Sequence, residues 1–162
     1  MNKSVYSFAT KTLQGKEISL SDFRGKVLLV VNTATGCGQS PQLTALEKLY
    51  QEYKDRGLMV IGFPSDQFNQ EPLEGNSIQE HCSINYGVTF PMMEKVMVNG
   101  KNAHPLFKFF NNKNENGAIQ AHPRWNFYKF LIGRNGEVID YFWTYRQPGN
   151  KKIRAAIEKA LG

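Results

Sequence analysis

Two short apolar runs separated by an amphipathic segment place the strongest constraint on how this chain can fold. The runs are "VLLVV" at 27–31 and "LMVIGFP" at 58–64, and their nearly uninterrupted apolar residues are typical of strands buried on both faces of a sheet. Between them, leucine and tyrosine recur every three or four residues over 43–53, which predicts a helix of about four turns. A strand, a helix and a strand in this order predict parallel strands joined by a right-handed crossover.

Further strands and helices are predicted on both sides of this unit. Before it, "GKEIS" predicts a short strand, and near the end of the chain two apolar runs joined by residues 134–136 are typical of a β-hairpin. Ser77 and Glu80 resemble a capping box at the start of a helix. Helices are predicted at 77–86, in "HPLFKFFNN" and at 151–161, and polar loops at 65–76 and 111–123. One α/β domain, residues 1–162, accounts for the whole chain.

Composition and charge exclude several classes of protein. Two cysteines in 162 residues are too few for a disulfide scaffold, and "MNKSVYSFATKTL" has no signal-peptide core, so we expect a reducing compartment, most simply the cytoplasm. The longest apolar run is far shorter than the roughly 18 to 20 residues of a membrane-spanning helix, so we expect a soluble protein without stable membrane insertion. The formal net charge of +6 is scattered, which argues against nucleic-acid binding and suits an acidic protein partner.

The first cysteine, Cys37 in "ATGCGQSPQL", lies between the first buried strand and the helix that follows it. In open α/β sheets, chemistry takes place at this carboxyl edge. Gly36 and Gly38 allow backbone amides to approach the thiol, and a helix N-terminus favours its thiolate form. Placement alone leaves two interpretations open, a nucleophile and a thiol packed as a small hydrophobic group.

A metal site is not expected from the remaining candidate ligands. Cys37 and Cys82 are far apart in the sequence, and His81, His104 and His122 are isolated, so no paired spacing of metal ligands occurs. We expect the histidines to lie at the surface or in turns. No cofactor is expected either.

Four stretches together resemble the glutathione peroxidase family. They are "VNTATGCGQSPQL", "GFPSDQFNQEP", "NYGVTFP" and "RWNFYKFLIGRNGEV", and the similarity covers almost the entire chain. The resemblance implies a thioredoxin-like α/β fold, in which a central mixed β-sheet is flanked by α-helices and carries an N-terminal β-hairpin extension. It also implies a peroxidase in which Cys37 occupies the position of the peroxidatic cysteine or selenocysteine, without selenium here.

The same resemblance implies roles for four further residues. Gln70, Trp125 and Asn126 match the family's other active-site positions, and their neutral N–H donors suit the stabilisation of a thiolate and of the charge that develops as the O–O bond breaks. Taken alone, Trp125 is also compatible with a core aromatic residue. Cys82 matches the resolving cysteine of the thioredoxin-dependent members, the alternative being a cysteine packed in its helix.

Three departures from the family pattern stand out. Ser65 and Asp66 replace a cysteine and an asparagine found in many members, and the loop that leads to "QEP" is one residue shorter than is common. Gly36 stands where a lysine often precedes the nucleophile. The brevity of segment 111–123, where tetrameric members carry an insertion, implies a monomer with an open active site.

The expected function is a thiol peroxidase with an antioxidant role in oxidative stress, which reduces hydrogen peroxide and organic or lipid hydroperoxides. Cys37 becomes a sulfenic acid, then forms a disulfide with Cys82, and thioredoxin reduces the disulfide. Disulfide geometry would require the helix around Cys82 to unwind. The alternatives are direct reduction by glutathione without an internal disulfide, a peroxide sensor or redox relay, and a non-catalytic thioredoxin-like binding domain.

Overall fold

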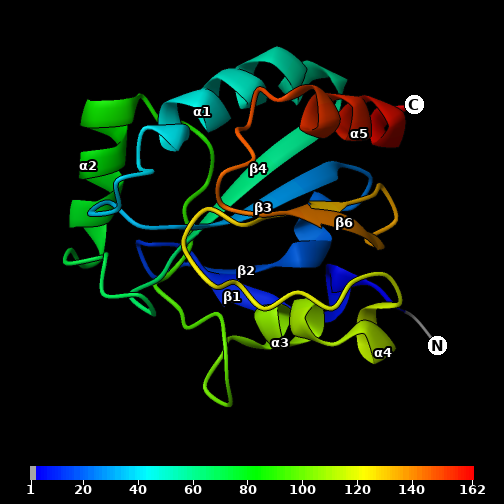
Figure 1. Cartoon of the computed structure of the whole chain (residues 1–162), viewed down its shortest axis with the longest axis horizontal. Helices are drawn as coiled ribbons and strands as arrows, with labels where there is room; N and C mark the ends of the chain where they lie inside the picture. The colour runs from blue at the N-terminus through cyan, green and yellow to red at the C-terminus, as the bar shows by residue number, and fades with distance from the viewer. Residues whose placement is uncertain (1–2) are drawn as a thin grey trace.

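A four-stranded mixed sheet lies at the centre of the computed structural model (Figure 1). The structure describes residues 3–162, so residues 1 and 2 of the expected domain lie outside the described residues. The spatial order of the strands is β4-β3-β5-β6, with bounds β3 (Val27–Thr33), β4 (Leu58–Pro64), β5 (Lys129–Ile132) and β6 (Val138–Phe142). β3 and β4 are parallel, whereas β5 is antiparallel to both β3 and β6. The predicted parallel pair, the predicted hairpin and the mixed sheet are therefore confirmed.

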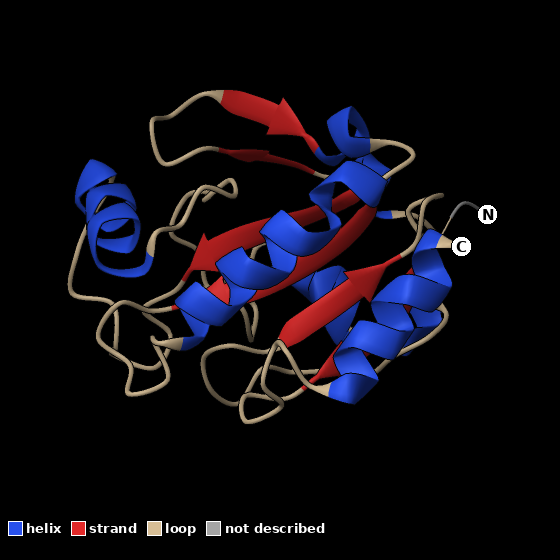
Figure 2. Ribbon diagram, turned by 90° about the horizontal axis from the view of Figure 1, so that it is seen from above, coloured by secondary structure: helices blue, strands red, loops and turns tan. Residues whose placement is uncertain are grey.

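Helices cover both faces of this sheet. α1 (Gln42–Tyr53) and α5 (Lys151–Leu161) lie across one face and are nearest the viewer in Figure 2, while α3 (Pro105–Asn111) packs on the other. Every residue of β3 is buried, and alternate side chains enter the two cores: Leu29 and Val31 join the side of α1 and α5, and Leu28 and Val30 join the side of α3. Burial on two faces explains the continuous apolar run.

The remaining elements lie at the margins of the sheet. An antiparallel hairpin of β1 (Ala9–Lys11) and β2 (Glu17–Ser19) forms the expected N-terminal extension. α2 (Asn76–Tyr86) stands at one end of the molecule, next to the start of α1 (Figure 1). Short helices complete the fold: η1 (Val5–Ser7), η2 (Leu20–Phe23), η3 (Lys54–Arg56) and α4 (Lys113–Asn116). None of the helices in residues 3–162 combines the length and the apolar character needed to cross a bilayer.

Two local predictions are wrong. α2 has no capping box at Ser77, because the helix begins one residue earlier, after Gly75, which turns the chain with a φ of 51° and offers no side chain. Segment 111–123 is not all loop, because the Asn112 side chain accepts a hydrogen bond from the Asn114 amide and caps α4. The buried Asn116 amide then donates to backbone carbonyls around it, including that of Ile119.

Candidate active site

Cys37 lies in the loop between the carboxyl end of β3 and the start of α1, as predicted. Its side chain is 4% exposed, and the backbone N–H of Gln39 points at its Sγ over 3.4 Å. The Cys37 carbonyl accepts from the Ser40 amide at 2.9 Å, which closes a turn just before α1. The thiol therefore faces a backbone N–H of the turn that leads into α1.

A second loop, 65–75, is held against the Cys37 loop through the backbone. The Gly36 amide donates to the Gln70 carbonyl at 2.8 Å, and a Cβ at Gly36 would lie only 2.6 Å from the same oxygen. Real Cβ atoms do not approach that closely, so only glycine permits this contact. The Gln70 backbone is thereby fixed beside the residue that precedes Cys37.

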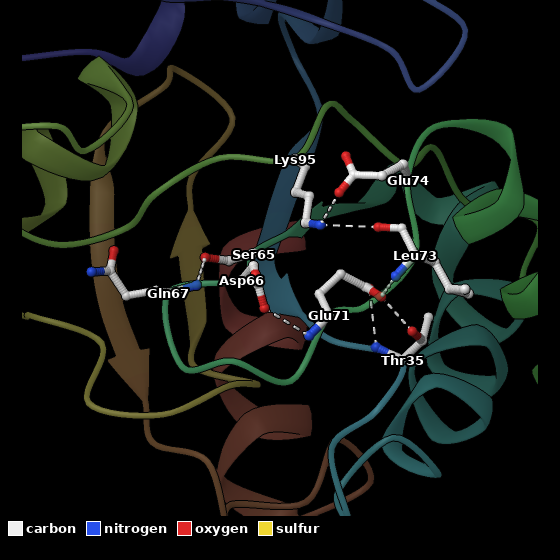
Figure 3. A network of polar contacts seen from close by, with 8 residues as sticks. All are labelled: Thr35, Ser65, Asp66, Gln67, Glu71, Leu73, Glu74 and Lys95. Carbon is white, nitrogen blue, oxygen red and sulfur yellow. Dashed lines mark hydrogen bonds and ion pairs between the residues drawn. The ribbon is translucent and has the colours of Figure 1, made fainter.

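A buried carboxylate strengthens the junction between the two loops (Figure 3). Glu71, 1% exposed, accepts from the Thr35 amide at 3.0 Å, from the Thr35 hydroxyl, and from the Leu73 amide at 3.4 Å. The ion pairs found among residues 3–162 do not include Glu71. No sequence pattern singled out Glu71, although a glutamate inside the "QEP" block beside a candidate site residue was a signal.

Trp125 and Asn126 are positioned by Asn32, a buried residue of β3. The Asn32 side chain donates to the Trp125 carbonyl at 3.0 Å and accepts from the Tyr128 amide at 3.0 Å, and its own carbonyl accepts from Phe127 at 2.6 Å. These bonds hold the backbone of Phe127 at a φ of 66°, a conformation that residues other than glycine rarely adopt. The Trp125 ring packs against the large apolar cluster to which Cys37 also belongs.

The Asn126 side chain is completely buried, and neither its Oδ1 nor its Nδ2 has a hydrogen-bond partner within the described part of the chain. A buried polar group left unsatisfied costs about 1–3 kcal/mol. Unpartnered buried groups of this kind occur at reactive sites and where an ordered water binds. Residues 3–162 contain no cluster of three histidine, cysteine or acidic side chains that could hold a metal ion.

Cys82 lies on α2 with its side chain fully buried, in the same apolar cluster as Cys37, and both thiols are free. Burial raises the pKa of Cys82 to about 12, and the Glu71 carboxylate acts in the same direction. A hydrogen bond of 2.7 Å between the hydroxyls of Ser40 and Tyr86 ties α2 to the start of α1. In this packing Cys82 is a protonated thiol inside an intact helix.

A cysteine at a strand end, before a helix on a mixed sheet of this topology, defines a protein of the thioredoxin-like class. The fold matches that of a thioredoxin family thiol:disulfide interchange protein from Chlorobium tepidum TLS, with a TM-score of 0.67 over 96% of this chain and 93% of that one at 21% identity. The crystal structure titled Trgpx in apo form has a TM-score of 0.75 at 37% identity, covering 98% of this chain and 95% of that one. The predicted fold is confirmed.

Sequence comparison then narrows the class to one family. The family model described as "Glutathione peroxidase" matches residues 5–111. A glutathione peroxidase of Lactococcus lactis subsp. cremoris is 48% identical over 96% of this chain and 98% of the relative, and a hydroperoxy fatty acid reductase of Synechocystis is 46% identical over 99% and 97%. The chain belongs to the glutathione peroxidase family and is a peroxidase with cysteine, not selenocysteine, at position 37.

Proposed function

We propose that this peroxidase uses Cys37 as its nucleophile and reduces hydrogen peroxide and organic hydroperoxides, including those of lipids. The observation that carries the proposal is the Cys37 thiol itself, which faces the backbone N–H of Gln39 in the turn before α1 and belongs to the apolar cluster against which Trp125 packs. The thiolate attacks one peroxide oxygen, the O–O bond breaks, and the other oxygen leaves with a proton as water or an alcohol. Cys37 is left as a sulfenic acid. The hydroperoxy fatty acid reductase among the relatives supports organic substrates.

Neutral donors around Cys37 stabilise the oxygen that leaves. Gln70 reaches the site through its backbone contact with Gly36, Trp125 through the shared apolar cluster, and Asn126 supplies a buried amide with no partner of its own. Donors fixed in advance are effective where charge develops, because they need no reorganisation during the reaction. Loss of one donor that contributes about 1.4 kcal/mol in the transition state slows the reaction about tenfold.

Cys82 is the resolving residue in this proposal. Its sulfur attacks the Cys37 sulfenic acid, the S–S bond forms, the S–O bond breaks, and the hydroxyl group leaves as water with the thiol proton. The buried, protonated state of Cys82 supports a sequence in which α2 first opens locally and frees the thiol. Thioredoxin then reduces the disulfide.

The compartment and the oligomeric state are also part of the proposal. Two free cysteines support action in a reducing compartment such as the cytoplasm. The short 111–123 segment supports a monomer in which residues 1–162 form one catalytic unit.

Coupled turnover assays test the choice of reductant. Both assays contain the protein, peroxide and NADPH. One adds thioredoxin and thioredoxin reductase, and the other adds glutathione and glutathione reductase. We expect NADPH oxidation with the thioredoxin system and little with glutathione. The reverse result would overturn the disulfide mechanism, and no turnover with either reductant, together with no oxidation of Cys37 by peroxide, would overturn the role of Cys37.

A further inference from the structure

Lys129 is completely buried near the candidate site, and the peroxide reaction described above gives this lysine no role. It lies on β5 between Phe127 and Leu131, whose side chains belong to the same apolar cluster as Cys37, so the alternation of the strand puts Lys129 on that face of the sheet. Its Nζ donates to the backbone carbonyls of Thr144 at 3.0 Å and of Trp143 at 3.4 Å. Lys129 is absent from the ion pairs found among residues 3–162.

The carbonyl that Lys129 binds is the start of a chain of hydrogen bonds that ends at Cys37. The Thr144 oxygen also accepts from the Gln42 side chain at 2.7 Å, in the first turn of α1. The same Gln42 nitrogen donates to the Gln39 side chain at 3.0 Å, and the backbone N–H of Gln39 faces the Cys37 Sγ.

Thr144 connects this chain to a second part of the site. Its hydroxyl donates to the Asn126 carbonyl at 2.7 Å, so the residue bonded to Lys129 also holds the segment that carries Trp125 and Asn126. The Lys129 amine is therefore bonded to a residue, Thr144, that contacts both the turn at Cys37 through Gln42 and the segment that carries Trp125 and Asn126.

Stability alone does not account for a lysine at this position. Burial lowers the pKa of Lys129 from 10.5 to about 7, so the folded protein holds the proton less readily than the unfolded chain does. A methionine of similar length would fill the space without desolvating an amine. Buried titratable groups with a displaced pKa cluster at functional sites, and the hydrogen bonds of Lys129 lead toward Cys37.

We propose that Lys129 is a positioning residue for the peroxide step. Through Thr144 and Gln42 it fixes the turn whose amide faces Cys37, and as an ammonium group it places a positive charge beneath that turn. The proposal rests on the assignment of Cys37 as the nucleophile. Lys129 also supplies a cation on the interior side of the site, where Gly36 offers no charged side chain.

The titratable and charged groups on the elements next to Lys129 lie mostly at the surface. β3 has none, and in β6 and the following segment Asp140, Tyr141 and Tyr145 are exposed and Arg146 is half-buried. The first turn of α1 presents Gln42. On α5, the side chains that face the sheet are the aliphatic Ile153, Ile157 and Leu161.

Lys129→Met is the direct test, because it separates stability from reactivity. The wild-type amine opposes folding increasingly as pH falls from 10.5 to about 7, so the variant should melt at a higher temperature than wild type, with the full gain below about pH 7. Its rate of oxidation by hydrogen peroxide, followed by stopped-flow fluorescence, should fall about tenfold or more. The pH at which Cys37 alkylation by iodoacetamide is half-maximal, measured in a Cys82→Ser background, should rise by about one unit.

Two further variants make the test specific. Leu131→Met, on the same strand and face, should change neither the rate nor the alkylation profile. Lys129→Gln keeps an N–H donor but has no charge, so the pH of half-maximal Cys37 alkylation should be as high as in Lys129→Met. If Lys129→Gln instead has the wild-type midpoint, the role of the charge is overturned. A Lys129→Met protein that melts lower than wild type, or that reacts as fast, would overturn the proposal. If wild-type Cys37 is itself not oxidised by peroxide, the proposed function fails instead.

Discussion

The two cysteines lie in one apolar cluster but meet opposite electrostatic surroundings. Cys37 sits in a loop, faces a backbone N–H in the turn before α1, and is linked by hydrogen bonds to the buried amine of Lys129. Cys82 sits inside a helix, and its pKa is raised by burial and by the buried carboxylate of Glu71. The first thiol therefore meets hydrogen-bond donors, whereas the surroundings of the second preserve the neutral thiol.

This difference teaches that the fold itself can set the order of the two thiol reactions. A thiolate attacks peroxide, and a neutral thiol reacts far more slowly. Cys82 is therefore protected from peroxide as long as α2 stays folded, and it becomes reactive when the helix opens and the thiol reaches water.

The largest effect is expected from the cysteines themselves. Cys37→Ser should abolish peroxide reduction, because serine is not oxidised. Cys82→Ser should leave one turnover intact and stop thioredoxin-driven cycling, because the sulfenic acid then has no internal partner. Mass spectrometry after peroxide and dimedone should find the adduct on Cys37 in the Cys82→Ser protein; an adduct on Cys82 in the Cys37→Ser protein would break the contrast.

The next effect is expected at the contact between the two loops. Gly36→Ala places a Cβ 2.6 Å from the Gln70 carbonyl, so the loops must separate. We expect a loss of about 1–3 kcal/mol in the free energy of unfolding and a fall of tenfold or more in the peroxide rate. Gly149→Ala is the matched control, because its Cβ would meet open space. Equal behaviour of the two variants in denaturant melts and stopped-flow assays would contradict the close approach.

A smaller effect is expected from one donor. Trp125→Phe removes the indole N–H and keeps an aromatic ring against Phe68, whose centroid lies 5.5 Å from that of Trp125. The peroxide rate should fall about tenfold, while stability changes little. Phe68→Leu, which alters the same packing without removing a donor, is the control. If both variants slow the reaction equally, packing rather than the N–H is responsible.

The smallest effect at neutral pH concerns Cys82. Its folded pKa of about 12 lies above the value of 9.0 for an unperturbed thiol, so its contribution to stability is complete below pH 9 and is lost as pH rises toward 12. Above about pH 10.5, where the opposite pH dependence from Lys129 has ended, the free energy of unfolding should decline by up to about 1.4 kcal/mol per pH unit. Urea melts at several pH values measure the slope. Cys82→Ala should remove most of it, and an unchanged slope in that variant would show that another group is responsible.

The framework of the fold was predictable because it rests on patterns within short windows of sequence. The apolar runs at 27–31 and 58–64 and the turn at 134–136 each report their own structure. α4 was missed because its start depends on one capping side chain, Asn112, in a segment whose composition indicates a loop. A run of polar residues is compatible with a loop and with a short capped helix, and the hydrogen bonds of its side chains decide between the two.

The candidate site was predictable in part, for a different reason. The position of Cys37 between a predicted strand and a predicted helix indicated a candidate nucleophile. Glu71 and Lys129 did not, because their partners lie far away in the chain, Thr35 for the first and Thr144 for the second. A lysine inside the apolar run "FYKFLI" was the visible signal of a buried charge, but the sequence could not say which carbonyls would receive it.

The contact between Gly36 and the Gln70 carbonyl also bears on how such chains can diverge. The resemblance to the family implies a loop to Gln70 one residue shorter than is common, and a glycine where a lysine often occurs. In this structure the two departures meet at one place, because the Gln70 carbonyl lies where a Cβ at position 36 would come too close. An inserted residue would give back the room for a lysine, so we expect a deletion in one loop and a glycine in the other to be inherited together.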